Sequence, residues 1–234
     1  MINRSSITLY SLGESAIVIQ FGKYIDEQVN RLVGAFSRYL ETCPILGMTE
    51  YIPAFTTVTI FYDVMQRNYI EMEQSVENAL RTFDVTQRYA EERIIEIPVC
   101  YGGDFGPDLK YVSEFHDLTE KEVIDIHTEV IYSVHMIGFA PGFPYLGGLS
   151  EKIATPRREL PRVQVPAGSV GIAGTQTGIY SISTPGGWQL IGQTPTKLFH
   201  PAKNPPSLLR SGDKIKFIPI SIKTYLNLKG NEAG

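Results

Sequence analysis

The sequence predicts an α+β protein of two domains, a ferredoxin-like βαββαβ domain over residues 1–90 and a barrel-like β domain over residues 91–234. Strand and helix patterns alternate in that order over about the first 90 residues. Beyond them, eleven of the 21 glycines fall between Gly138 and Gly192 and separate short apolar runs. Short strands divided by glycine and proline turns indicate a β-barrel or sandwich. The length of 234 residues suits two ordinary domains.

The first domain opens with a strand and an amphipathic helix. Ser15–Phe21 is rich in valine and isoleucine and follows a turn at Gly13, which predicts a strand. Asp26 is the expected N-cap of a helix whose apolar residues recur every three or four positions over residues 29–40. Pro44 ends this helix because its ring and missing N–H cannot continue the hydrogen-bond pattern.

A hairpin, a helix and a final strand complete the predicted first domain. The β-branched runs Met48–Pro53 and Thr56–Tyr62 predict the two strands of the hairpin. A second helix is expected to begin near Asn68, and the isoleucine-rich run Arg93–Val99 supplies the final strand. The sequence places the domain boundary near residues 88–93, without a long linker.

The second domain begins with helix signals and continues with strands. Asp108–Phe115 predicts a short helix, and Thr119 with Glu122 forms a capping-box pattern at the start of the next. Val130–Ile137 predicts a strand. Further short strands are expected over Val163–Val165, Ser169–Ile172, Ile179–Ser183, Gln189–Ile191 and Ile215–Ile222.

Composition excludes some classes of partner. The net charge of −4 and a pI near 5.6 argue against nucleic acid or an anionic membrane as the main partner. The polar segment Met1–Tyr10 does not resemble a signal peptide, and no apolar run approaches 18 residues. We therefore expect a cytoplasmic protein. Cys43 and Cys100 are expected to be two buried, reduced thiols.

No nucleophile elbow, zinc-protease motif or Walker motif occurs in the sequence. The four histidines, at positions 116, 127, 135 and 200, lack ligand spacing, so no metal site is expected from this chain alone. The run Gly168–Gly174 superficially suggests a phosphate loop. It lacks a lysine and a following helix, so tight barrel turns explain it better, although its backbone amides are candidates for holding an oxyanion.

The most unusual block, Gly138–Gly148, alternates glycine and proline with aromatic residues. One interpretation is a folded loop that plugs a barrel end; the other is a concave apolar surface for a ligand or partner. The second interpretation gives a candidate loop and partner surface, which extends to barrel residues further along the chain. Its residues are Phe139, Pro141, Phe143, Tyr145, Gly168, Gly171, Gly174 and Trp188. For Trp188 the alternative role is to fill the hydrophobic core.

A basic run follows this block. Arg157, Arg158 and Arg162 lie between prolines, which reduces the entropy they lose on binding. Their planar guanidinium groups suit a carboxylate or a phosphate. With Gln176 they form the candidate substrate or anion-binding site, the alternative being a solvated surface run. No catalytic residue can be assigned.

The long run Gly138–Pro195, which contains GFAPGFPYLGGL, PRRELPRVQVPAGSVGIAGTQTG and STPGGWQLIGQTP, resembles the allophanate hydrolase subunit 1 family. This family is also called KipI or PxpB, the B subunit of bacterial 5-oxoprolinase. Leu12–Ala16, Asp108-Leu109, Ile126–Thr128 and Leu198-Phe199 also resemble the family pattern, so the similarity spans nearly the whole chain. The resemblance implies that the C-terminal domain is a cyclophilin-like β-barrel.

The resemblance also implies a shared enzyme. An allophanate hydrolase subunit 2 type protein (KipA or PxpC) and a LamB/YcsF-type protein (PxpA) are the implied partners. Together the three hydrolyse 5-oxo-L-proline to L-glutamate with ATP and Mg²⁺, which are expected to act in the assembled complex because no cofactor site is evident in this chain alone. The alternative role is a KipI-type inhibitor that binds the dimerisation domain of a sensor histidine kinase. Prolyl isomerisation is a weaker alternative, because a fold does not carry a function.

Overall fold

A computed structural model of the protein describes residues 7–24, 26–84 and 93–231. The chain divides into two compact units, Met1–Glu91 and Glu92–Gly234. The boundary predicted near residues 88–93 falls mostly on residues 85–92, which lie outside the described residues. Of the predicted polar opening Met1–Tyr10, only residues 7–10 are described.

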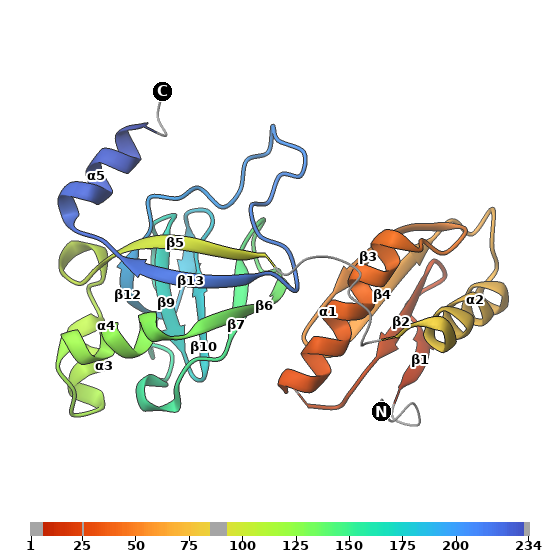
Figure 1. The fold of residues 1–234 in the computed structure, drawn as a ribbon, viewed down its shortest axis with the longest axis horizontal. Coiled ribbons are helices and arrows are strands. Elements are labelled where there is room, and N and C mark those ends of the chain that lie inside the picture. Colours follow the sequence, from red (N-terminus) through yellow and green to blue (C-terminus); the bar gives the residue numbers. More distant parts are fainter. Residues whose placement is uncertain (1–6, 25, 85–92, 232–234) are drawn as a thin grey trace. The chain divides into compact units, whose positions relative to one another are not determined.

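The first unit is a four-stranded antiparallel sheet with two helices (Figure 1). The strands lie side by side in the order β1-β2-β4-β3. The elements along the chain are β1 (Thr8–Ser11), β2 (Ala16–Gln20), α1 (Glu27–Thr42), β3 (Met48–Pro53), β4 (Thr57–Tyr62) and α2 (Tyr69–Thr82).

The predicted βαββαβ order is wrong in its last strand. The run predicted to close the sheet forms β5 (Ile94–Tyr101), which pairs with β12 and β13 in the second unit. Its expected place beside β2 is taken by β1, so the unit reads ββαββα. A tight turn explains the exchange, because the Leu12 amide donates to the Ala16 carbonyl at 2.9 Å and so pairs β1 with β2 locally.

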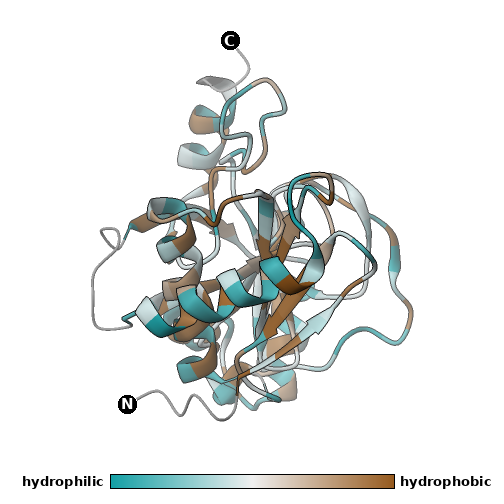
Figure 2. Ribbon diagram, turned by 90° about the vertical axis from the view of Figure 1, so that its right-hand side faces the viewer, coloured by the Kyte–Doolittle hydropathy of each residue, from teal (hydrophilic) through white to brown (hydrophobic). Residues whose placement is uncertain are grey.

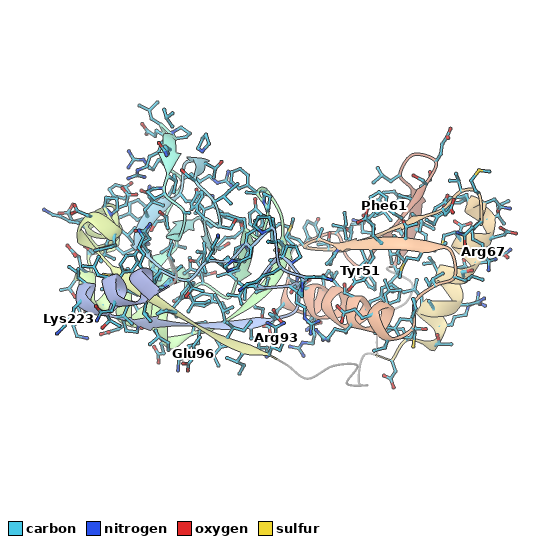
Figure 3. The ribbon with its side chains drawn as sticks, turned by 90° about the horizontal axis from the view of Figure 1, so that it is seen from above. Tyr51, Phe61, Arg67, Arg93, Glu96 and Lys223 are labelled. Atoms are coloured by element: carbon cyan, nitrogen blue, oxygen red, sulfur yellow. The ribbon has the colours of Figure 1, made fainter. Side chains whose placement is uncertain are left out.

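Both helix starts predicted in this unit are confirmed. The Asp26 side chain caps α1 by accepting from the Val29 amide, and Asn68 forms a capping box with Glu71 on α2. Both helices pack on one face of the sheet, over a core that includes Ile17, Ile19, Phe36, Val58, Ile60, Met72 and Val76. Tyr51 packs on that core, whereas Phe61 belongs to the opposite face of the neighbouring strand (Figure 3).

The second unit contains a closed barrel, which confirms the barrel expectation (Figure 1). Its strand order is β10-β7-β6-β13-β5-β12-β9, and β5 and β13 run parallel while the other neighbours run antiparallel. The barrel strands after β5 are β6 (Ile131–Ile137), β7 (Pro144–Gly147), β9 (Ser169–Ala173), β10 (Gln176–Ile179), β12 (Gln189–Gln193) and β13 (Lys214–Pro219). A separate two-stranded ribbon joins β8 (Arg162–Val165) to β11 (Thr184–Gly186).

Helices accompany the barrel. α3 (Leu109–Phe115) and α4 (Glu120–Glu129) pack together, and the predicted Thr119–Glu122 capping box on α4 is confirmed. Two short 3-10 turns, η2 (Gly103–Phe105) and η3 (Glu151–Ile153), and the C-terminal α5 (Ile222–Asn231) complete the unit. Figure 3 labels Arg93 and Glu96 at the start of β5 and Lys223 on α5.

Several predicted elements of this unit are corrected. The strand expected over Ile179–Ser183 is instead the end of β10 followed by a bend. The strand expected over Ile215–Ile222 ends at Pro219, because α5 begins at Ile222. The strand β7 was not predicted, because its four residues lie in the glycine- and proline-rich block, where turn signals dominate.

The strands are rich in hydrophobic residues, whereas the helices mix hydrophobic and hydrophilic ones (Figure 2). Within the described ranges, every helix is too short or too polar to cross a bilayer. The cysteine prediction was half right: both thiols are free and Cys100 is buried, but Cys43 at the end of α1 is exposed.

Candidate functional site

Two of the predicted arginines meet on one buried carboxylate. Arg158 Nη1 lies 3.0 Å and Arg162 Nη2 lies 2.8 Å from the same oxygen, Oδ1 of Asp108. The Asp108 side chain is 7% exposed, against 36% for Arg158 and 22% for Arg162. The structure therefore brings together residues that are 50 and 54 positions apart in the sequence.

Backbone contacts fix Asp108 in this position. Its second oxygen, Oδ2, accepts from the Leu190 amide at 2.7 Å, and its own amide donates to the Leu190 carbonyl at 2.9 Å. Only glycine permits the close approach at Gly106, since a Cβ there would lie 2.0 Å from the Ile191 carbonyl oxygen. The segment before α3 is thus held against β12, with its carboxylate aimed at the arginines.

We define the arginine cluster as Arg157, Arg158 and Arg162 with Asp108. The cluster keeps a net positive charge and N–H groups that have no acceptor among the described residues. Three guanidinium groups and one carboxylate leave a formal charge of +2. Arg158 Nε and Arg162 Nη1 are buried and have no acceptor among the described residues. Buried donors normally find an acceptor, so two unpaired N–H groups on fixed arginines suit an anionic ligand.

Arg157 is exposed, and its charge acts on two phenol groups of the barrel. Burial raises the pKa of the Tyr145 hydroxyl, and the Arg157 charge partly offsets this rise. Burial also raises the pKa of Tyr180, opposed by a hydrogen bond with the Trp188 backbone and by the charges of Arg157 and Arg162. These electrostatic effects place the arginine cluster beside the two tyrosines.

An aromatic cluster lies at this end of the barrel, and we define it as Phe143, Tyr145, Tyr180 and Trp188. Phe143 is central, with its ring 4.9 Å from Tyr145, 5.3 Å from Tyr180 and 5.6 Å from Trp188, all edge to face. Edge-to-face contacts add to the stabilisation from burial. The cluster therefore forms a rigid apolar wall next to the arginines.

Phe139 stands out from this wall. It is 63% exposed and has φ of +68°, a backbone conformation that a bulky residue rarely adopts. Its ring contacts Phe143 at 5.4 Å and Tyr180 at 6.5 Å. Strained residues of this kind concentrate at functional sites, so Phe139 is the candidate contact residue of the loop.

Burial divides the predicted loop and partner surface. Phe139, Pro141 and Gly174 are exposed and Tyr145 is half-buried. The others cannot offer a side chain to a partner, because Phe143, Gly168, Gly171 and Trp188 are buried within the unit. Trp188 is thus a core residue, which matches the alternative interpretation of the sequence.

The predicted oxyanion role of the Gly168–Gly174 amides is wrong for two of the three glycines. The Gly168 amide donates to the Tyr180 carbonyl at 2.6 Å, and the Gly174 amide donates to the Thr155 carbonyl at 2.7 Å. Gly171 lies inside β9, between β10 and β12. The interpretation as barrel structure is therefore the correct one, and the segment is not a phosphate loop.

Gln176 lies apart from the Asp108 ion pairs, at the start of β10, where it pairs with Ala173. His127 is fully buried and lies in the barrel interior. A groove of about 820 Å³ borders Gly168. None of the three arginines lines it, so it is separate from the arginine cluster. Two of its polar wall residues are engaged internally: Gln193 donates to the Ala167 carbonyl at 2.8 Å, and Gln164 donates to the Ser183 hydroxyl at 3.1 Å.

Sequence reasoning missed Asp108 as a site residue. It marked this aspartate only as the start of a helix and as part of the family-like pair with Leu109. The one usable signal was the charge imbalance of the arginine run, which requires a carboxylate from outside it once the arginines are partly buried.

Comparison with known proteins identifies the family. Residues 7–209 match the family described as carboxyltransferase domain, subdomain C and D. The B subunit of 5-oxoprolinase from Bacillus subtilis is 55% identical over 224 residues, covering 92% of this chain and 93% of that protein. The chain belongs to the family of 5-oxoprolinase B subunits. This confirms the resemblance seen in the sequence.

Other members of the family extend the match. The 5-oxoprolinase B subunit of Escherichia coli O157:H7 is 43% identical over 212 residues, covering 90% of this chain and 94% of that one. The crystal structure of a conserved uncharacterized protein from Pyrococcus horikoshii matches with a TM-score of 0.56 and 41% identity, over 93% of this chain and all of that one. In a longer protein of known structure (TM-score 0.77, 31% identity), the match covers 89% of this chain but only 40% of that one. These relatives support a component of a 5-oxoprolinase-type system.

Proposed function

We propose that this chain is the non-autonomous B subunit of an ATP-dependent 5-oxoprolinase, which hydrolyses 5-oxo-L-proline to L-glutamate with companion subunits. The proposed companions are an allophanate hydrolase subunit 2 type protein (KipA or PxpC) and a LamB/YcsF-type protein (PxpA). Support comes from relatives named as the B subunit of 5-oxoprolinase, which cover nearly the whole chain.

The arginine cluster is the observation that carries this proposal to specific residues. 5-Oxoproline bears a carboxylate beside a lactam, and a carboxylate accepts two N–H groups from arginine well. Arg158 and Arg162 are held by Asp108 and each retains a buried N–H without an acceptor among the described residues. We assign these two arginines to the substrate carboxylate or to a phosphoryl oxygen, with Arg157 at the exposed rim and Gln176 as a more distant polar contact.

The chemistry explains why one chain does not suffice. A lactam is a stabilised amide, so its carbonyl requires activation, for which we propose phosphorylation by ATP before water attacks. Within the described residues, no cluster of three His, Cys, Asp or Glu side chains could hold a metal ion. We therefore assign Mg²⁺ and nucleotide to the assembled complex, and to this chain the binding and orientation of an anionic group.

Reconstitution tests the proposal. The purified chain, the two companion subunits and all their combinations are assayed for glutamate and phosphate release from 5-oxoproline and ATP. We expect turnover only when this chain and its companions are combined. Full ATP-coupled turnover by this chain alone would overturn the shared site, and a fully active complex without this chain would overturn the proposed role.

A second candidate function is a KipI-type inhibitor of a sensor histidine kinase. It draws on exposed apolar side chains of the second unit: Phe139 at 63%, Leu160 at 81% and Val163 at 89% exposure. Phe139 also has the positive φ of a strained residue, which is common at functional sites. Titration against a purified kinase dimerisation domain tests it, and Phe139→Ala is expected to weaken binding at least tenfold. Unchanged binding by that variant would remove this surface from the kinase role.

A further inference from the structure

The first unit has two sheet edges that differ in chemistry. The β3 edge carries Glu50, Pro53 and a register shift between Met48 and Glu50. Charges, prolines and bulges are the usual devices that prevent an edge from pairing with another strand. The β1 edge, residues 8–11 with sequence TLYS, carries none of these three devices. Among the described residues no strand pairs with the outer side of β1, so this edge is able to accept one.

The backbone groups of β1 are arranged for such pairing. The register pairs Leu9 with Ile19 and Ser11 with Ile17, and the Leu12 amide bonds to the Ala16 carbonyl. In an antiparallel ladder hydrogen-bonded and non-hydrogen-bonded pairs alternate, so Leu9 and Ser11 belong to non-hydrogen-bonded pairs. Their N–H and C=O groups thus point away from β2, toward the open edge.

A groove of about 420 Å³ lies between β1 and α2. Ile7 and Leu9 line it from the strand side. The helix side is one face of α2, because its residues lie three or four positions apart, with two adjacent ones at the end. They are Glu73, Glu77, Leu80 and Arg81. An edge strand beside a helix gives an added strand both backbone partners and side-chain contacts.

The charges of the groove select its occupant. Two glutamates and one arginine give its walls a net charge of −1, and Arg81 already pairs with Glu77 at 3.3 Å. Glu73 Oε1 accepts from the Tyr69 hydroxyl at 2.8 Å, and its second oxygen can still accept from a cation. The apolar groups of Ile7, Leu9 and Leu80 suit an aliphatic side chain.

From these features we infer that β1 and α2 form a docking site for an extended segment of a companion subunit, which adds a strand to β1 and places a lysine or arginine beside Glu73 and Glu77. That the partner is a companion subunit rests on the proposed function; the edge and groove do not depend on it. This site belongs to the first unit and is separate from the arginine cluster.

Amide hydrogen exchange on the full chain, alone and with each purified companion subunit, tests the pairing directly. We expect the Leu9 and Ser11 amides to exchange at least tenfold more slowly in the complex. The Tyr10 amide, which already bonds to β2, should change much less. If a companion binds and the Leu9 and Ser11 amides are unprotected, the inference fails while the proposed function stands. If no companion binds the chain, both fail.

Two variants test the groove. The double change Glu73→Lys/Glu77→Lys reverses the charge, and Ser11→Pro removes one edge donor without breaking a β1–β2 hydrogen bond. Each is expected to weaken companion binding at least tenfold, whereas the exposed control Glu14→Lys stays within twofold. Thermal unfolding of each variant shows whether the unit still folds. Equal weakening of companion binding by Glu14→Lys would overturn the inference. So would slower amide exchange in β1 as the concentration of the chain alone rises, which would point to a second copy of this chain as the occupant.

Discussion

Asp108 Oδ1 accepts a hydrogen bond from Arg162 Nη2 at 2.8 Å, across 54 residues of sequence. The same oxygen accepts from Arg158, so one carboxylate fixes two guanidinium groups. Asp108 touches the arginines rather than any ligand, and it is best described as a positioning residue. Its removal should therefore affect both the fold of the site and the geometry of anion binding.

We predict that Asp108→Asn lowers the free energy of unfolding by about 1–3 kcal/mol. The variant leaves two partly buried guanidinium groups without their counter-charge, and the partial exposure of both arginines keeps the loss below that of a fully buried pair. Urea denaturation measures it, and the exposed neighbour Asp104 supplies the control Asp104→Asn. Equal stability of the two variants would contradict the structural role of Asp108.

Arg158→Lys and Arg162→Lys test the proposed carboxylate contact. Lysine keeps the charge but cannot hold Asp108 and a ligand with one planar fork. Loss of one charge-assisted hydrogen bond costs about 1.5–3 kcal/mol, or roughly a 10- to 100-fold rise in the KM for 5-oxoproline. Steady-state kinetics of the reconstituted complex measure it, with Lys152→Ala from the same stretch as control. A fall in kcat at unchanged KM would instead indicate a role after substrate binding.

Local signals in the sequence predicted local structure well. Asp26, Asn68 and Thr119 were expected to start helices and do so, because a cap depends on residues only three positions away. The β5 strand was recognised from its isoleucines, but its partners were not, since β5 pairs with β12 and β13 about a hundred residues later. Propensity carries no information on which sheet a strand joins.

In the candidate site, too, local composition was predictable from the sequence and long-range contacts were not. The arginine run and the aromatic block were found because their composition is unusual. Asp108 was missed because its role arises only when the segment 102–108 packs on β12. The amides of Gly168 and Gly174 were overrated, since sequence cannot show that the Tyr180 and Thr155 carbonyls already occupy them.

Phe139 and Phe143 are predicted to respond oppositely to truncation. Phe143 is 1% exposed, so Phe143→Ala should cost about 3–5 kcal/mol of stability by leaving a cavity. Phe139 is largely exposed at positive φ, so Phe139→Gly should be neutral or stabilise by up to about 1 kcal/mol. Chemical denaturation of both variants measures these changes. If Phe139→Gly lowers the free energy of unfolding by more than about 2 kcal/mol, the ring contacts of Phe139 outweigh its backbone strain.

His127 lies at the centre of a buried hydrogen-bond chain in the barrel. Thr177 donates its hydroxyl to the Gly171 carbonyl at 3.0 Å, so it accepts from His127 Nε2 at 3.0 Å. His127 Nδ1 then accepts from the Tyr101 hydroxyl at 2.8 Å. This network requires the neutral imidazole with its proton on Nε2, and the ring stacks on Phe217.

Burial lowers the pKa of His127 from 6.5 to about 3, which makes the stability of the second unit depend on pH. Between these values the unfolded chain binds a proton that the folded chain does not, so stability falls as the pH drops below 6.5. His127 alone contributes about 1.4 kcal/mol per pH unit in this window. We predict that the stability difference between wild type and His127→Gln is largest near pH 7 and shrinks by about that amount per unit toward about pH 4. Urea denaturation across this range measures it, and a difference that stays constant with pH would show that the imidazole titrates alike in both states.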